Sequence, residues 1–179
     1  ENGTVQWDAG TQNNRTWPGV VVADIDGDSD LEVAVAQGGG YLTVYDHNGQ
    51  EVWSRRPETN ELRGLSVFDL DADGTDELVV TATGDGVNTY VYEHNGTLRS
   101  GWPQLSNDSG YAWGVYNDNA ALGDLDNDGQ GELVIPSDVH YINAYEANGA
   151  QIAANAIYGG VGWGKVGIWE SLVPELRGW

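Results

Sequence analysis

The stretch Asp24-Ile-Asp-Gly-Asp-Ser-Asp-Leu-Glu32 decides the fold, because two gap-free copies of its pattern follow it. The copies are Asp69-Leu-Asp-Ala-Asp-Gly-Thr-Asp-Glu77 and Asp124-Leu-Asp-Asn-Asp-Gly-Gln-Gly-Glu132, and all three share D-x-D-x-D-[GS]-x-x-E. They start 45 and 55 residues apart. Self-similarity at this spacing is typical of repeat architectures, in which each unit buries its apolar face against its neighbours.

A second pattern, Y-[DE]-x-N-G, repeats in step with the first. Its copies are Tyr45-Asp-His-Asn-Gly49, Tyr92-Glu-His-Asn-Gly96 and Tyr145-Glu-Ala-Asn-Gly149. Asn-Gly between extended segments is a strong hairpin signal, because both residues tolerate a positive φ in a type I′ turn. Each acidic stretch is therefore expected to be a loop that belongs to a larger antiparallel unit.

Runs rich in Val, Ile, Tyr and Thr flank both patterns and predict four strands in each unit. The first unit's strands are expected at 19–23, 31–36, 41–45 and 50–53, the second unit's at 65–68, 77–81, 89–92 and 97–99, and the third unit's at 120–122, 133–136, 141–145 and 151–154. Four antiparallel strands per unit of this length predict an all-β protein built from β-propeller blades.

The two patterns together resemble the FG-GAP/VCBS family of calcium-binding β-propellers, which includes integrin-alpha-like blades. The resemblance covers roughly residues 19–155 and rests on the three acidic loops, each between the first two strands of a unit. Ser29 is a departure, since the family favours Gly there. The resemblance implies a propeller and a calcium ion in each loop.

The chain is expected to be a single propeller segment over 1–179, with blades at 19–56, 62–104 and 111–157. Residues 1–18 are expected to end a preceding blade, because Asn2–Trp7 matches Asn48–Trp53 in spacing and ending, and 158–179 to begin a further blade or a tail. About three blades do not close a ring, since propellers typically have about four to eight. The expectation is a part of a larger propeller or a ring completed by other copies, with a small closed sandwich as the alternative.

The charge is strongly acidic, with 7 Lys plus Arg against 28 Asp plus Glu and a formal net charge of −21. Such a chain is repelled by phosphate backbones and by anionic membrane surfaces, so nucleic acid is not an expected partner. No apolar run in the sequence approaches the roughly 20 residues that span a bilayer, so membrane insertion is not expected either. The absence of Cys excludes disulfides and thiolate chemistry. The acidity is concentrated in the loops, which hold 14 of the 28 acidic residues.

Carboxylates at this spacing suit Ca²⁺, which takes about six to eight oxygen ligands in a flexible shell. Positions 1, 3, 5 and 9 would supply side chains and position 7 its carbonyl, so about three ions are expected. An EF-hand is excluded because its Glu at position 12 is replaced by Val35, Val80 and Ile135. The alternative, solvated acidic turns, leaves like charges crowded without a cation. The candidate ligands are Asp24, Asp26, Asp28, Asp30 and Glu32; Asp69, Asp71, Asp73, Thr75 and Glu77; and Asp124, Asp126, Asp128, Gln130 and Glu132.

Weaker signals concern glycans and aromatic residues. N-x-[ST] sequons at Asn2, Asn14, Asn95 and Asn107 fit a secreted glycoprotein. Trp7, Trp53 and Trp102 follow Asn-Gly turns and are expected to pack between blades, whereas Trp113, Trp163 and Trp169 lie outside this scheme and are candidates for a carbohydrate platform.

The predicted function is an extracellular calcium-binding propeller module for adhesion, for glycan or protein binding, or for assembly of a surface structure, with structural calcium. Its partners would be a protein or glycan ligand, or further copies that complete the ring. Catalytic residues are not assigned, and a non-enzymatic role is favoured. The alternative is part of a polysaccharide lyase or another carbohydrate-active propeller enzyme, against which the few basic residues argue, six Arg and one Lys.

Overall fold

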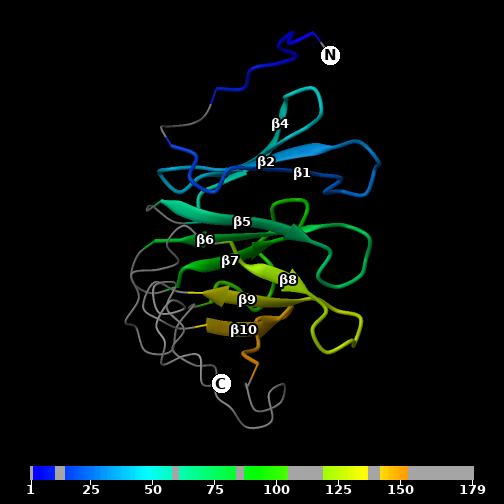
Figure 1. Cartoon of the computed structure of the whole chain (residues 1–179), viewed down its shortest axis with the longest axis vertical. Helices are drawn as coiled ribbons and strands as arrows, with labels where there is room; N and C mark the ends of the chain where they lie inside the picture. Colours follow the sequence, from blue (N-terminus) through cyan, green and yellow to red (C-terminus); the bar gives the residue numbers. More distant parts are fainter. Residues whose placement is uncertain are drawn as a thin grey trace, which may run out of the picture.

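A computed structural model describes residues 2–10, 15–57, 61–83, 87–104, 119–136 and 142–152. Every regular element in these ranges is a β-strand, and every strand pairing is antiparallel. The ten strands form three sheets in chain order (Figure 1). The predicted all-β fold class is confirmed.

The first sheet has four strands in the order in which they occur along the chain. They are β1 (Val20–Ala23), β2 (Glu32–Ala36), β3 (Leu42–Tyr45) and β4 (Glu51–Arg55). The acidic stretch joins β1 to β2, and the Asn-Gly turn joins β3 to β4. This order is the up-and-down arrangement that the repeats predict for a blade.

The second and third sheets have three strands each. The second contains β5 (Leu62–Phe68), β6 (Glu77–Ala82) and β7 (Thr89–Tyr92), and the third contains β8 (Ala121–Gly123), β9 (Glu132–Pro136) and β10 (Ile142–Glu146). The ends of all ten strands lie within three residues of the predicted ones. The local pattern therefore places these strands correctly.

The fourth strand predicted at 97–99 is wrong as a strand. Beside β7 the chain makes isolated contacts instead of a continuous strand: a bridge joins Tyr92 to Leu98, and Arg99 N–H donates to Val91 O at 2.9 Å. The chain then turns at Gly101, whose φ is +91°, and the turn interrupts the pairing, which resumes in a second bridge between Gln104 and Thr89. In the third unit a bridge joins Tyr145 to Gln151, and Ile152 N–H donates to Ala144 O at 2.9 Å. Residues 153–154 of the strand predicted at 151–154 lie outside the described residues.

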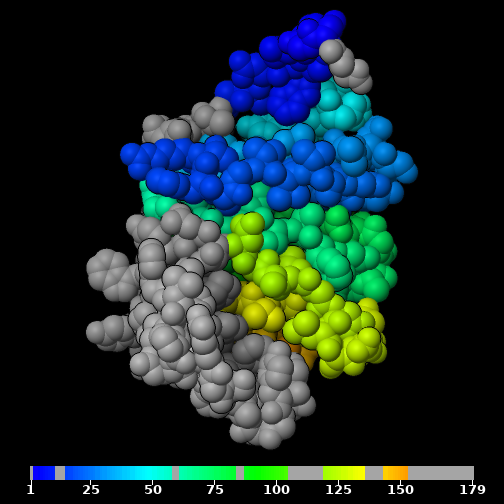
Figure 2. All heavy atoms as spheres, viewed as in Figure 1, coloured from blue at the N-terminus to red at the C-terminus, as the bar shows by residue number. Residues whose placement is uncertain are grey.

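The three sheets pack face to face in chain order, and Figures 1 and 2 show them following one another from the N-terminal end. One buried core lies between the first and second sheets and another between the second and third. In β6, Leu78 and Val80 enter the first core, whereas Val79 enters the second. Successive side chains of a strand point to opposite faces, so the middle of β6, which is buried on both faces, is a continuous apolar run, Leu78–Val80.

A tryptophan links each unit to the next. Its indole Nε1–H donates to the backbone carbonyl of the residue before an Asn-Gly turn. The pairs are Trp7 with His47 (3.2 Å), Trp53 with His94 (2.8 Å) and Trp102 with Ala147 (3.0 Å). The predicted packing of these three tryptophans between units is confirmed.

The Y-[DE]-x-N-G motif also supplies the surface on which each indole lies. The tryptophan rings meet the motif's tyrosine at centroid separations of 6.2, 6.3 and 5.5 Å; the pairs are Trp7–Tyr45, Trp53–Tyr92 and Trp102–Tyr145. A Cβ on Gly49 or Gly96 would lie 2.5 or 2.7 Å from the indole above it. The glycine therefore serves both the positive φ of the turn and the close approach of the ring.

Candidate metal centres

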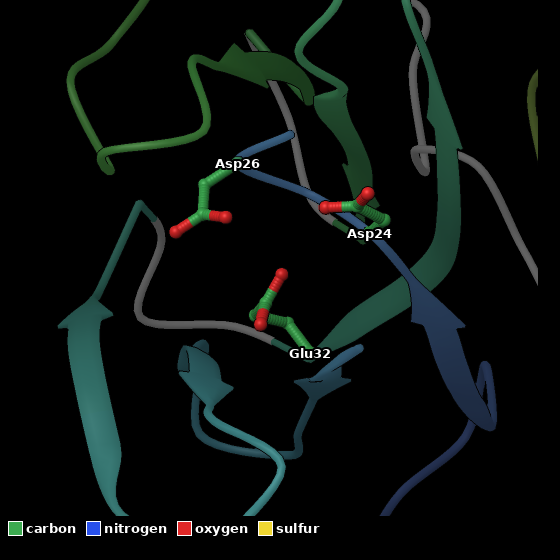
Figure 3. A group of neighbouring side chains, drawn as sticks. All are labelled: Asp24, Asp26 and Glu32. Atoms are coloured by element: carbon green, nitrogen blue, oxygen red, sulfur yellow. The ribbon is translucent and has the colours of Figure 1, made fainter. Parts of the chain in front are cut away.

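The three acidic loops lie at one edge of the stacked sheets, each between the first two strands of its unit (Figure 1). In each loop the carboxylates at positions 1, 3 and 9 offer ligand atoms within 4.8 Å of one another. The groups are Asp24, Asp26 and Glu32; Asp69, Asp71 and Glu77; and Asp124, Asp126 and Glu132. Figure 3 shows the first group, whose carboxylates point toward a common space.

The glutamate at position 9 is buried in every loop, with 5, 0 and 1% of Glu32, Glu77 and Glu132 exposed. One carboxylate oxygen, Oε2, accepts the backbone N–H of position 2. These hydrogen bonds join Glu32 to Ile25 (2.9 Å), Glu77 to Leu70 (2.7 Å) and Glu132 to Leu125 (2.5 Å). The bond closes the loop back onto its own second residue.

In two of the loops the other oxygen of the glutamate makes no hydrogen bond. Glu77 Oε1, which has only the Arg99 guanidinium 3.5 Å away, and Glu132 Oε1 are buried in this way, and so is Asp24 Oδ1 in the first loop. Burying an unpaired carboxylate oxygen is costly unless a cation or a proton neutralises it. Accordingly, burial raises the pKa of Glu77 to about 8 and also raises the pKa values of Glu32 and Glu132. These oxygens are suited to a metal ion.

Aspartates at positions 1 and 5 hold the loop backbone in shape. Position 1 accepts the N–H of position 6 through Oδ2, at 3.0 Å for Asp24, 3.0 Å for Asp69 and 3.1 Å for Asp124. Position 5 accepts the N–H of position 7 at 2.8 Å in every loop; these acceptors are Asp28, Asp73 and Asp128. The backbone of each loop is therefore held by hydrogen bonds to its own carboxylates.

The position-5 aspartates do not belong to the three close groups. Their assignment as ligands stays a prediction, as does that of the position-7 carbonyls of Asp30, Thr75 and Gln130.

Positions 4 and 6 of every loop have a positive φ, between +58° and +92°. Glycine occupies position 6 in the second and third loops, but Ser29 adopts φ +80° in the first. Position 4 holds Gly27, Ala72 and Asn127. A side chain in this left-handed region costs about 1–2 kcal/mol, so Ser29 and Ala72 carry local strain.

Neighbouring loops are hydrogen-bonded to one another. The carbonyl of Ile25 accepts the N–H of Asp76 at 2.9 Å, and the carbonyl of Leu70 accepts the N–H of Gly131 at 2.8 Å. In the first two loops the residue at position 2 therefore makes two bonds. Its N–H donates to the glutamate of its own loop, and its carbonyl oxygen accepts an N–H of the next loop. The three loops form one connected row, in which the order of one loop constrains its neighbour.

The sequence-family model of the FG-GAP-like repeat matches this chain twice, over residues 24–80 and 69–135. The chain belongs to the FG-GAP-like repeat family. Each match begins at the first aspartate of an acidic loop, and together the matches contain all three loops. No curated protein sequence matches this FG-GAP chain.

Solved structures support the propeller-like fold. The biofilm matrix protein Bap1 of V. cholerae is 26% identical, with a TM-score of 0.52 over 76% of this chain and 20% of the Bap1 chain. BBS1N, solved in complex with ARL6DN, matches in two crystal structures, each with a TM-score of 0.53. In the first it is 13% identical over 78% of this chain and 43% of BBS1N. In the second it is 14% identical over 84% of this chain and 45% of BBS1N. This FG-GAP chain thus spans a fifth of Bap1 and less than half of BBS1N.

The second loop differs from the others because an arginine enters it. Arg99 Nη2 donates to Asp71 Oδ2 at 2.9 Å, and Arg99 Nη1 lies 3.5 Å from Glu77 Oε1. Sequence reasoning missed this residue, since Arg99 lies outside both repeated patterns and 28 residues from Asp71. Its only sequence signal is a basic side chain in a chain with few of them.

The remaining predicted residues fall into two groups. Asn2 and Asn95 are exposed on Asn-Gly turns, where their side-chain oxygens accept the N–H of Thr4 and Thr97. The other predicted positions lie outside the described residues: Asn14, Asn107, Trp113, Trp163 and Trp169. Within the described ranges there is no helix long and apolar enough to cross a membrane.

Proposed function

We propose that this protein is an extracellular β-propeller module that binds one Ca²⁺ in each acidic loop, the ions being structural. The observation that carries the proposal is the buried position-9 glutamate. It has one oxygen bonded to the loop backbone, and its second oxygen, in Glu77 and Glu132, has no hydrogen bond. Three loops repeat the same group of converging carboxylates.

The donor set favours calcium over other ions. Every candidate ligand is a hard oxygen, and the chain has no Cys or Met to bind softer metals. Mg²⁺ demands tighter octahedral geometry and keeps more of its water, whereas Ca²⁺ accepts the larger, more variable shell that an acidic loop offers. Acidic modules of this kind suit the millimolar calcium outside cells.

A structural role follows from the position of the loops. Each ion would join the end of one strand to the start of the next, and the loops are bonded to one another along the row. Binding to the folded state alone stabilises that state by mass action. Calcium would thus hold the sheets together at this edge.

For the wider role we propose adhesion, binding of a glycan or protein, or assembly of a surface structure. Support comes from the similarity to Bap1, a biofilm matrix protein, over 76% of this chain. The partner would be such a ligand or further copies of the chain that complete the ring. Nothing in the described residues favours the alternative of a polysaccharide lyase.

The test is thermal unfolding in excess chelator and in millimolar CaCl₂ or MgCl₂. We expect the melting temperature to rise in calcium well above its value in magnesium. Asp124→Asn should lose part of this gain, whereas Glu51→Gln, which removes one charge from an exposed position outside the loops, should retain it. A melting temperature that is unchanged between chelator and calcium would refute the proposal.

A further inference from the structure

Arg99 makes five polar contacts around the second loop. Beyond Asp71 and Glu77, its Nη1 lies 3.2 Å from both carboxylate oxygens of Glu93, and its Nε donates to Ala147 O at 3.1 Å. The side chain is only 13% exposed. The guanidinium is therefore held in place by the second and third units together, rather than free to leave the loop.

We propose that Arg99 is a tethered cation that neutralises the second acidic loop, so that this loop binds Ca²⁺ more weakly than the first and third loops. The inference rests on the proposed function, since it concerns the same row of sites. It predicts that three loops of nearly identical sequence differ in affinity because of one residue outside them.

The contacts place the charge on two of the three grouped ligands. Asp71 occupies position 3 and Glu77 position 9, and the Glu77 oxygen facing Arg99 is Oε1, the one that makes no hydrogen bond. A calcium ion would need this same oxygen. The ion and the guanidinium therefore compete for the same carboxylates.

Within the described residues, no equivalent arginine enters the other two loops. At the same spacing after the Asn-Gly turn, the first and third units carry Val52 and Ile152. Within the described residues, the ion pair recorded for the first loop joins Asp30 to His47, both exposed, and none is recorded for Asp124, Asp126 or Glu132. The difference between the sites thus comes from the residue that stands three positions after the glycine of each Asn-Gly turn.

Simple electrostatics gives the size of the effect. A single positive charge about 5 Å from a divalent ion weakens binding by about tenfold even at the dielectric constant of water, and by more in a partly buried site. Arg99 keeps its charge at every relevant pH. Burial opposes that charge, but the hydrogen bond to Asp71 and the charges of Glu93 and Glu77 outweigh it and raise the pKa of Arg99.

Isothermal titration of the full chain with CaCl₂ tests the inference, using wild type, Arg99→Gln and Arg55→Gln. Arg55 is a matched control, because its Nε also donates to a carbonyl of the next unit, Gly96 O at 2.7 Å, but among the described residues it forms no ion pair with an acidic loop. Wild type and Arg55→Gln should bind two ions tightly and a third at least about tenfold more weakly. Arg99→Gln should bind three ions with similar affinity.

A second readout is the melting temperature in chelator. Arg99→Gln should melt lower than Arg55→Gln without calcium, because Glu77 and Asp71 lose the guanidinium that pairs with them, and should gain more from added calcium. Three equal sites in the wild type would overturn the inference, even if Arg99→Gln fails to fold. So would an unchanged weak site in Arg99→Gln. If the wild type binds no calcium at any loop, the proposed function fails instead.

Discussion

Replacing Trp53 with alanine tests whether the indole is the main link between the first and second units. Trp53 is 7% exposed, belongs to the core between the first two sheets and donates to His94 O at 2.8 Å. Removing a buried tryptophan typically costs about 3–5 kcal/mol. For a protein of this size about 1 kcal/mol lowers the melting temperature by about 2–4 °C. The expected loss is therefore about 6–20 °C.

Two further variants separate the contributions to this loss. Trp53→Phe keeps a ring over Gly96 but removes the hydrogen bond, so it should cost about 1 kcal/mol for the bond in addition to a smaller packing loss. Trp7→Ala should cost less than half as much as Trp53→Ala, because Trp7 makes the same contacts from a more exposed position.

The measurement is urea and thermal unfolding of all three variants in saturating calcium, so that metal binding is constant. The reasoning is refuted if Trp53→Ala unfolds within about 1 kcal/mol of wild type, which is below the range for buried tryptophans. It is also refuted if Trp7→Ala and Trp53→Ala are equally destabilised, since the loss would then not follow burial.

Three other predictions concern the loops. Ser29→Gly should raise the melting temperature in chelator by about 2–4 °C, because it relieves about 1 kcal/mol of left-handed strain, and an unchanged value would contradict this. Gly131→Ala should destabilise the folded protein, since the new Cβ would lie 2.8 Å from the Phe68 ring. Gly123→Ala is the control and should not destabilise it, because a Cβ there meets nothing within 4 Å. Equal urea midpoints for the two variants would contradict the close packing at Gly131. Because burial raises the pKa of Glu77 to about 8 from an ordinary value of 4.5, the folded state binds the extra proton, so calcium-free protein should lose stability as the pH rises from 4.5 to 8. A melting temperature that rises over this range in chelator would be inconsistent with that sign.

Local sequence patterns predicted much of the fold. The Asn-Gly turns and the runs of β-branched residues depend on neighbouring residues alone, and they placed all ten strands to within three residues. The acidic repeats likewise predicted three carboxylate groups, because positions 1, 3 and 9 of a tight loop converge wherever the loop folds. The strand predicted at 97–99 is wrong, since the turn at Gly101 interrupts the pairing with β7, which resumes only at Gln104.

The sequence by itself determined the repeat, the strands and the residues of the acidic loops. Only the tertiary structure decided which residues meet across units. Trp53 reaches His94, Asp76 bonds Ile25, and Arg99 enters the second loop, across separations of 28 to 51 residues. The physical reason is that hydrogen-bonded turns are fixed by adjacent residues, whereas contacts between sheets depend on how whole units stack.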